Sequence, residues 1–198
     1  MKLIRAALAT ALFLSVLIPT YYLHANFFKV DVVFYAAIAD AVMAALATGA
    51  LLYVLKGFRV FNHFERLLLV VIWLLSGYAM AISVPTVIDR SLSFYILEKL
   101  QQRGGGIQQA RFAQVFTDEY LKEHRLVDVR LTEQLASGTI AIQNGCVRLT
   151  AKGESLASFS RYFRAHWLPK ERLLLGTYSD ALVDPFRNSG AQPDYACQ

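Results

Sequence analysis

The stretch LLLVVIWLLSGYAMAISV, residues 67–84, decides the architecture of this chain. It carries no charged residue. As a helix rising 1.5 Å per residue, it is about long enough to cross a bilayer core of roughly 30 Å. The run stops at Pro85, where we expect the helix to end. The chain before it is almost entirely apolar, whereas the chain after it has the composition of a soluble polypeptide.

Two further apolar runs precede this stretch. Residues 6–23 follow Lys2 and Arg5, as in a signal peptide, but no small-x-small cleavage site follows, so a retained helix is expected. Residues 32–55 are long enough to span a bilayer with some tilt. We therefore predict a mainly α-helical membrane protein whose transmembrane domain, residues 1–88, contains spans at about 6–23, 32–55 and 67–84.

Small residues recur every four positions in the second run, at Ala37, Ala41, Ala45 and Gly49. Such a stripe lets another helix approach closely. Asp40 lies beside it, and a carboxyl group inside a span is costly and is a functional candidate by default. We expect Asp40 to hydrogen-bond to Ser76, Tyr78 or a partner protein. One alternative is that Asp40 and the stripe bind a partner or a lipid headgroup. Another is proton chemistry at Asp40.

The distribution of lysine and arginine predicts the orientation. Lys2 and Arg5 precede the first span, and Lys56, Arg59 and Arg66 lie between the second and third, whereas the first connection has only Lys29. The positive-inside rule makes the more basic side cytoplasmic. In a bacterial inner membrane, the amino terminus is then cytoplasmic and the segment after the third span is periplasmic.

Charge and cysteine content restrict what the soluble half can do. Residues 89–198 contain fourteen Lys/Arg and twelve Asp/Glu, a balance that does not favour binding to a polyanion. The chain has two cysteines, Cys146 and Cys197. They are too few for a disulfide framework, although one bridge between them could form in an oxidising compartment and hold the tail.

Local signals predict a series of short elements after the spans. We expect a helix over 91–102, capped by Asp89 or Ser91 and ended by the glycines at 104–106, and a second over 110–116. Thr117 is the expected N-cap of a third helix that ends near His124. A fourth is expected over 126–136.

A hairpin and a long helix follow. Strands over 139–142 and 146–149 flank Asn144-Gly145, a dipeptide typical of type I′ turns. Thr150 is the expected cap of a helix over 151–168, closed by Pro169. Its apolar stripe consists of Leu156, Phe159, Phe163 and Trp167.

This order of elements, with RLTEQLASGTI at 130–140 and VRLTAKG at 147–153, resembles the recognition-helix-to-wing segment of MarR- and PadR-like winged-helix proteins. The resemblance covers about residues 91–168. It implies a small winged-helix-like α+β domain over 89–168, with one β-hairpin. Residues 169–198 would then form a C-terminal extension that starts with a helix through Leu175.

In DNA-binding relatives the helix before the wing enters the major groove. The resemblance therefore makes Arg130, Thr132, Gln134 and Arg148 candidate nucleic-acid contacts. However, the exposed side of that helix also offers Asp128 and Glu133, and one arginine against two acids is a poor surface for phosphates. The fold likeness does not by itself imply DNA binding.

No catalytic, metal or cofactor motif is present: the four histidines lie on different predicted elements, and no phosphate loop or nucleophile elbow occurs. We expect no cofactor and no metal. A basic cluster lies near the end of the long helix, at Arg161, Arg164, Lys170 and Arg172. It is interpreted either as cations that stabilise a helix C-terminus or as a site for an anionic headgroup or acidic partner.

The sequence thus favours a non-catalytic accessory subunit that docks on a larger integral-membrane protein and contacts membrane lipid. The process in which we expect that larger protein to act is envelope glycan or lipid assembly. The alternative is a membrane-tethered winged-helix transcriptional regulator, and an integral-membrane enzyme that uses Asp40 is less favoured because no catalytic constellation accompanies it.

Overall fold

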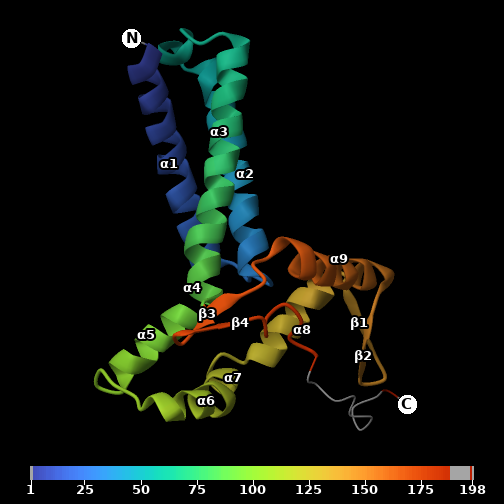
Figure 1. Ribbon diagram of the computed structural model, residues 1–198. Coiled ribbons are helices and arrows are strands. Elements are labelled where there is room, and N and C mark those ends of the chain that lie inside the picture. The colour runs from blue at the N-terminus through green and yellow to red at the C-terminus, as the bar shows by residue number, and fades with distance from the viewer. Residues whose placement is uncertain (1, 188–196, 198) are drawn as a thin grey trace. The chain divides into compact units, whose positions relative to one another are not determined.

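The computed structural model describes residues 2–187 and 197, and its contacts divide the chain into two compact units, Met1–Val127 and Asp128–Gln198 (Figure 1). Unit 1 contains α1 (Lys2–Phe27), α2 (Val33–Val54), η1 (Lys56–Phe58), α3 (His63–Ala81), η2 (Ile82–Thr86), α4 (Val87–Arg90), α5 (Leu92–Gln102), η3 (Gln109–Arg111), α6 (Phe112–Gln114), η4 (Val115–Tyr120) and α7 (Leu121–Glu123). α8 (Leu126–Ala136) crosses the division. Unit 2 continues with β1 (Ile140–Gln143), β2 (Cys146–Leu149), α9 (Ala151–Trp167), β3 (Arg172–Leu174) and β4 (Thr177–Ser179).

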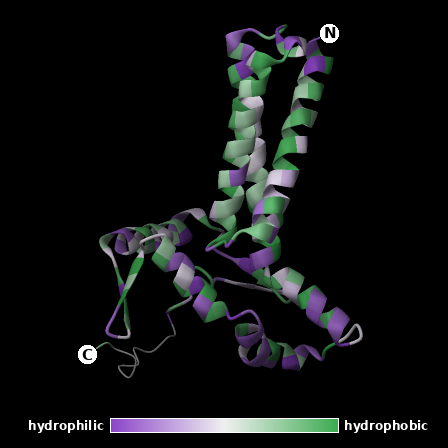
Figure 2. Ribbon diagram, turned by 180° about the vertical axis from the view of Figure 1, so that it is seen from behind, coloured by the Kyte–Doolittle hydropathy of each residue, from purple (hydrophilic) through white to green (hydrophobic). Residues whose placement is uncertain are grey.

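Three helices are long and apolar enough to cross a membrane: Lys2–Phe27, Val33–Val54 and the continuous helical run His63–Arg90. They lie side by side, and most of their length is hydrophobic (Figures 1 and 2). The mainly α-helical architecture predicted from the sequence is confirmed. The first and third helices extend beyond the predicted apolar runs because their polar ends remain helical, whereas α2 begins and ends within one residue of the predicted run.

The third helix differs from the prediction at both ends. It begins at His63 because Asn62 and Glu65 form a capping box, in which the Asn62 side chain accepts from Glu65 N and the Glu65 side chain accepts from Asn62 N. The expectation that it ends at Pro85 is wrong. A π-helical turn, η2, contains Pro85, and helix continues to Arg90. Proline lacks a backbone N–H, and a wider turn accommodates that loss without ending the helix.

The core of the three-helix bundle forms around Trp73 on α3, whose side chain is 0% exposed. Its indole ring stacks on Phe13 of α1 with the ring centroids 5.4 Å apart, and its Nε1 donates to Thr10 Oγ1 at 3.2 Å. The small-residue stripe of α2, Ala37, Ala41, Ala45 and Gly49, is buried. A Cβ atom added to Gly77 of α3 would lie 2.5 Å from Ala41 Cβ. The stripe therefore packs against helices of the same chain.

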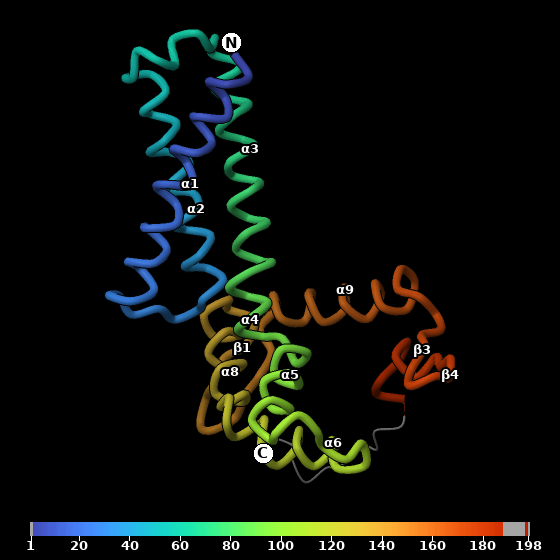
Figure 3. The backbone as a smooth tube through the Cα atoms, turned by 90° about the vertical axis from the view of Figure 1, so that its left-hand side faces the viewer, coloured from blue at the N-terminus to red at the C-terminus, as the bar shows by residue number. Residues whose placement is uncertain are grey.

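The chain reverses direction at each end of the bundle (Figure 3). The amino terminus and the connection between α2 and α3 lie at the same end, where Lys2 Nζ is 2.7 Å from Glu65 Oε1. The basic residues of the amino-terminal flank and of this connection are consequently on one side of the bundle. The short α1–α2 connection is at the other end.

The rest of unit 1 packs α5 against the helical run from Phe112 to Glu123 around Tyr95, Val115 and Tyr120. The Ser91 side chain caps α5 as predicted. The expected helix start at Thr117 is wrong: Thr117 lies inside the π-helical segment η4, and its hydroxyl donates to the Ala113 carbonyl oxygen at 3.2 Å. A threonine inside a helix can satisfy its hydroxyl in this way, so its capping propensity is not used.

Unit 2 forms the predicted hairpin and long helix. β1 pairs antiparallel with β2, and Asn144 and Gly145 have positive φ values of 52° and 75° in the turn. The Thr150 side chain accepts from Gly153 N and caps α9. A Cβ atom at Gly153 would overlap the carbonyl oxygen of Thr139, so only glycine lets the helix start approach the hairpin this closely.

A second hairpin replaces the helix expected up to Leu175. β3 pairs antiparallel with β4, and Leu175 and Gly176 form the turn with φ values of 48° and 91°. The prediction of a helix here is therefore wrong, whereas the one hairpin predicted within residues 89–168 is the β1–β2 hairpin. Gly176 after an apolar run permits the reversal, which helical periodicity alone does not show. Cys146 and Cys197 are joined by a disulfide, with their Cα atoms 5.9 Å apart.

Candidate functional site

Asp40 on α2 forms a hydrogen bond to His24 on α1, with Asp40 Oδ1 2.7 Å from His24 Nδ1. The Asp40 side chain is 1% exposed, and the His24 side chain is only partly exposed. The expectation that Ser76 or Tyr78 would be the partner within the chain is wrong. We call these two residues the His24–Asp40 pair; both lie on helices long and apolar enough to cross a membrane.

Sequence reasoning missed His24 because the apolar run ends at Leu23. In the structure α1 continues to Phe27, so His24 remains helical and reaches the side of α2 that carries Asp40. The signal that could have identified it is the tight reversal between the helices, residues 28–32. Because the reversal is short, residues near the end of one span and the start of the next must lie at similar depth.

The second carboxylate oxygen, Asp40 Oδ2, is buried and has no hydrogen-bond partner within residues 2–187 and 197. Two cavities share Asp40 and His24. One, of about 120 Å³, is also lined by Tyr21, Ala25, Val30, Val33 and Ala36. The other, of about 310 Å³, is lined by Thr20, Leu23, Phe28 and Met43, and the last three of these side chains are exposed. The His24–Asp40 pair therefore borders a groove that opens at the bundle surface.

This arrangement can accept a hydrogen bond or balance a positive charge. A buried oxygen without a donor costs about 1–3 kcal/mol, so a donor that enters the groove from outside the chain would be stabilised there. The His24 ring is already engaged by Asp40 through its Nδ1 atom. The described part of the chain also contains no cluster of three His, Cys, Asp or Glu side chains for a metal.

A second group of charges connects α5 to the helical run 112–123. Lys99 is 4% exposed, and its Nζ lies 2.6 Å from both Glu119 Oε2 and Glu123 Oε1. Arg103 Nη2 contacts both oxygens of Glu119, at 3.0 and 2.8 Å, and Tyr95 donates to Glu123 at 3.0 Å. We call these five residues the Lys99 network.

The contacts in the Lys99 network shift the protonation of its members. The hydrogen bonds to Glu119 and then Glu123 raise the pKa of Lys99 to about 12. Hydrogen bonding to Lys99 is the largest influence that lowers the pKa of Glu119 and of Glu123. Burial, followed by the hydrogen bond to Glu123, raises the pKa of Tyr95. All four groups are therefore held in their usual state at neutral pH.

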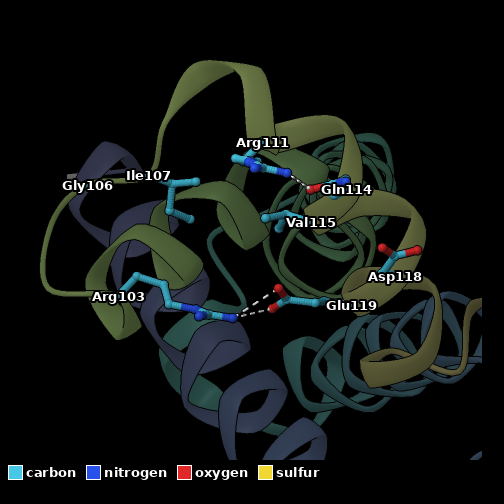
Figure 4. A pocket seen from close by; sticks show the side chains of 8 residues that line it. All are labelled: Arg103, Gly106, Ile107, Arg111, Gln114, Val115, Asp118 and Glu119. Atoms are coloured by element: carbon cyan, nitrogen blue, oxygen red, sulfur yellow. Dashed lines mark hydrogen bonds and ion pairs between the residues drawn. The ribbon is translucent and has the colours of Figure 1, made fainter.

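Beside the Lys99 network lies an open pocket of about 420 Å³, whose lining residues are shown in Figure 4. Arg103 points at Glu119, and Arg111 donates to the side chain of Gln114 at 2.9 Å. Both arginines that could bind an anionic ligand thus already have partners within the pocket. This geometry is better suited to holding α5 against the run 112–123 than to binding a ligand.

The predicted basic cluster is partly assembled. Arg161 and Arg164 line a cavity of about 410 Å³ together with Val183, Asp184, Pro185 and Phe186. Lys170 Nζ donates to the Ala165 carbonyl oxygen in the last turn of α9, which is the helix-stabilising role considered for this cluster. Arg172 lies on β3.

The candidate nucleic-acid residues are mostly engaged within unit 2. Arg130 Nη1 lies 2.8 Å from Glu133 Oε2, and the Thr132 hydroxyl donates to the Asp128 carbonyl oxygen at 2.8 Å. Gln134 Oε1 accepts from the Thr139 hydroxyl. Arg148 is exposed on β2. This pattern offers little free positive charge to a phosphate backbone.

No protein-family model, curated protein or solved structure matches this chain.

Proposed function

We propose that this protein is a non-catalytic accessory subunit of a bacterial inner membrane, and that it docks on a larger integral-membrane protein through the groove beside Asp40. The observation that carries the proposal is Asp40 Oδ2, a buried carboxylate oxygen for which the described residues provide no hydrogen-bond donor. A transmembrane helix that presents a donor, above all a lysine or arginine, would supply one.

The surroundings of Asp40 favour a side chain of a partner helix as the donor. The groove of about 310 Å³ is bordered by the exposed apolar side chains of Leu23, Phe28 and Met43. Its volume is at the lower end of the range of about 300–1,000 Å³ that is usual for pockets of drug-sized ligands. Polar groups inside spans characteristically pair across helices, and charged ones pair with opposite charges.

The small-residue stripe does not carry the proposal, although its spacing suggested a partner helix. Ala37, Ala41, Ala45 and Gly49 are already covered by α1 and α3 of the same chain. A partner would therefore meet the outer surface of the bundle, where the groove opens.

Two observations support the proposed orientation, with the amino terminus in the cytoplasm and unit 2 in the periplasm. The basic residues of the amino-terminal flank and the α2–α3 connection lie at one end of the bundle, as the positive-inside rule requires of cytoplasmic segments. The Cys146–Cys197 disulfide is typical of a protein segment exposed to an oxidising compartment.

The test is co-purification of the tagged full-length chain from native membranes in mild detergent. We expect a stoichiometric integral-membrane partner with the wild-type chain, and at least a tenfold loss with Asp40→Leu, because the buried oxygen that would accept the partner's hydrogen bond is removed. Asp31→Asn is the matched control: Asp31 is an exposed acid on the α1–α2 connection and should not affect recovery.

Recovery of the wild-type chain alone in every detergent tested would contradict the proposal. An Asp40→Asn chain that assembles normally while the complex loses its activity would instead indicate proton chemistry at the His24–Asp40 pair. Retention of specific DNA by the full chain at physiological salt, together with a cytoplasmic unit 2, would favour the tethered regulator.

A further inference from the structure

Unit 2 exposes an unbroken row of apolar side chains along α9. Leu156, Phe159, Phe163 and Trp167 follow helical spacing and share one face, yet their exposed fractions range from 41% to 69%. The ring centroids of Phe159 and Phe163 are 5.8 Å apart, and those of Phe163 and Trp167 are 6.4 Å apart. We call these four residues the aromatic face.

The opposite side of α9 is occupied differently. Arg161, Arg164 and Ala165 border the cavity formed with residues 183–186, so the segment after β4 lies along the polar side of the helix. The segment after β4 therefore covers the polar side of α9 and leaves the aromatic face exposed. Exposed aromatic patches of this kind mark interaction surfaces.

The β3–β4 hairpin, which follows α9 directly, adds a second apolar element (Figure 3). Leu173, Leu174, Leu175 and Tyr178 are exposed, and Leu175 at the tip is 92% exposed. A leucine at positive φ is strained by contact of its Cβ with the backbone, a strain that asparagine or glycine largely avoids. The turn of the β1–β2 hairpin uses Asn144 at the equivalent position, with nearly the same φ. Leucine at the β3–β4 tip thus indicates a requirement for an apolar group there.

Positive charge surrounds these apolar elements. Residues 161–172 contain four Lys/Arg and one acid, Glu171. Lys170 and Arg172 lie between the end of α9 and the hairpin tip. Basic residues next to exposed tryptophan, phenylalanine and leucine are typical of protein segments that lie in the headgroup layer of an anionic bilayer.

We propose that the aromatic face of α9 and the Leu175 tip insert together into the headgroup layer of an anionic membrane. The membrane is the favoured occupant because the surface combines apolar side chains with flanking cations, and because three helices of the same chain are long and apolar enough to anchor it in a bilayer. Tethering raises the effective concentration of lipid at unit 2, so even weak insertion is populated. The inference is independent of the partner proposed at Asp40.

Trp167 provides a direct probe, since the chain contains only two tryptophans. Trp73→Phe retains a ring to stack on Phe13 and leaves Trp167 as the sole tryptophan. This chain is reconstituted into vesicles of phosphatidylcholine alone or with phosphatidylglycerol, and its emission is recorded with lipids brominated at several depths. The wild-type chain provides the same comparison, with the buried Trp73 as a constant background, in case Trp73→Phe impairs folding.

We expect blue-shifted Trp167 emission that is quenched most by bromines close to the headgroups, and more strongly in the anionic vesicles. Lys170→Gln should lower the insertion equilibrium about fivefold in anionic vesicles and little in neutral ones. Leu175→Asn should reduce insertion in both while leaving the turn intact, because asparagine tolerates positive φ.

Trp167 emission that stays that of a water-exposed indole in both vesicle types, with full access to iodide, would overturn the inference. So would shielding of Trp167 that occurs only when a native protein partner is added, since the aromatic face would then be a protein-docking surface. Loss of partner recovery by Asp40→Leu with unchanged Trp167 insertion would show that the two surfaces act separately.

Discussion

The three-helix bundle buries a core of apolar side chains, whereas unit 2 leaves its large apolar side chains exposed. In the bundle, Trp73, Phe13 and the stripe of α2 are buried against one another within the chain. In unit 2, Thr139 and Gly153 are the only buried residues between 128 and 187. The bundle therefore has its own core, whereas unit 2 is held by hairpins, helix caps and a disulfide, and its large apolar side chains are exposed.

The two tryptophans give the largest expected difference between these regions. Trp73→Ala removes a fully buried indole and should lower the free energy of unfolding by about 3–5 kcal/mol. Trp167→Ala removes an indole that is 69% exposed and should change the free energy of unfolding by no more than about 0.5 kcal/mol. Far-ultraviolet circular dichroism during unfolding in detergent micelles measures both. Equal destabilisation would mean that unit 2 also has a core around Trp167.

Glycine substitutions in unit 1 test how tightly the bundle is closed. Gly77→Ala places a methyl group against Ala41 and should cost about 1–3 kcal/mol, because backbone and side chains must shift to admit it. Gly106→Ala is the control, since a Cβ there would have no neighbour within 4 Å. If Gly77→Ala left the free energy of unfolding unchanged, α2 and α3 would be able to move apart without loss of stability. The stripe would then again be a candidate surface for a partner helix.

The Lys99 network predicts a smaller, pH-dependent effect within unit 1. The lowered pKa values of Glu119 and Glu123 contribute stability above the usual carboxyl range, and this is lost as the pH falls through those lowered values. The raised pKa of Lys99 contributes stability that is complete below its usual value of about 10.4 and is lost as the pH rises through about 12.

Replacing Lys99 by methionine should accordingly lower the thermal midpoint at pH 7, with a difference from wild type that shrinks toward pH 2. Lys122→Met, at an exposed position on α7, is the matched control and should have little effect at either pH. A Lys99→Met difference that is the same at pH 7 and pH 2 would show that the lysine acts through packing of its aliphatic chain rather than through its charge.

The sequence alone determined the elements whose signals are local. Three apolar runs predicted three long helices, Asn144-Gly145 predicted a hairpin turn, and Ser91 and Thr150 predicted helix starts, because each depends on neighbouring residues. Three predictions from local signals were wrong: Pro85 did not end its helix, Thr117 did not start one, and residues 172–179 form a hairpin where a helix was expected up to Leu175.

Tertiary structure alone decided which groups meet. That Asp40 pairs with His24 depends on how far α1 extends and on the reversal before α2, neither of which is encoded next to Asp40. Periodicity identified the stripes of α2 and α9 equally well, yet the first is buried and the second is exposed. Periodicity shows only that side chains share a face. What covers that face depends on residues distant in the sequence, which the fold alone brings together.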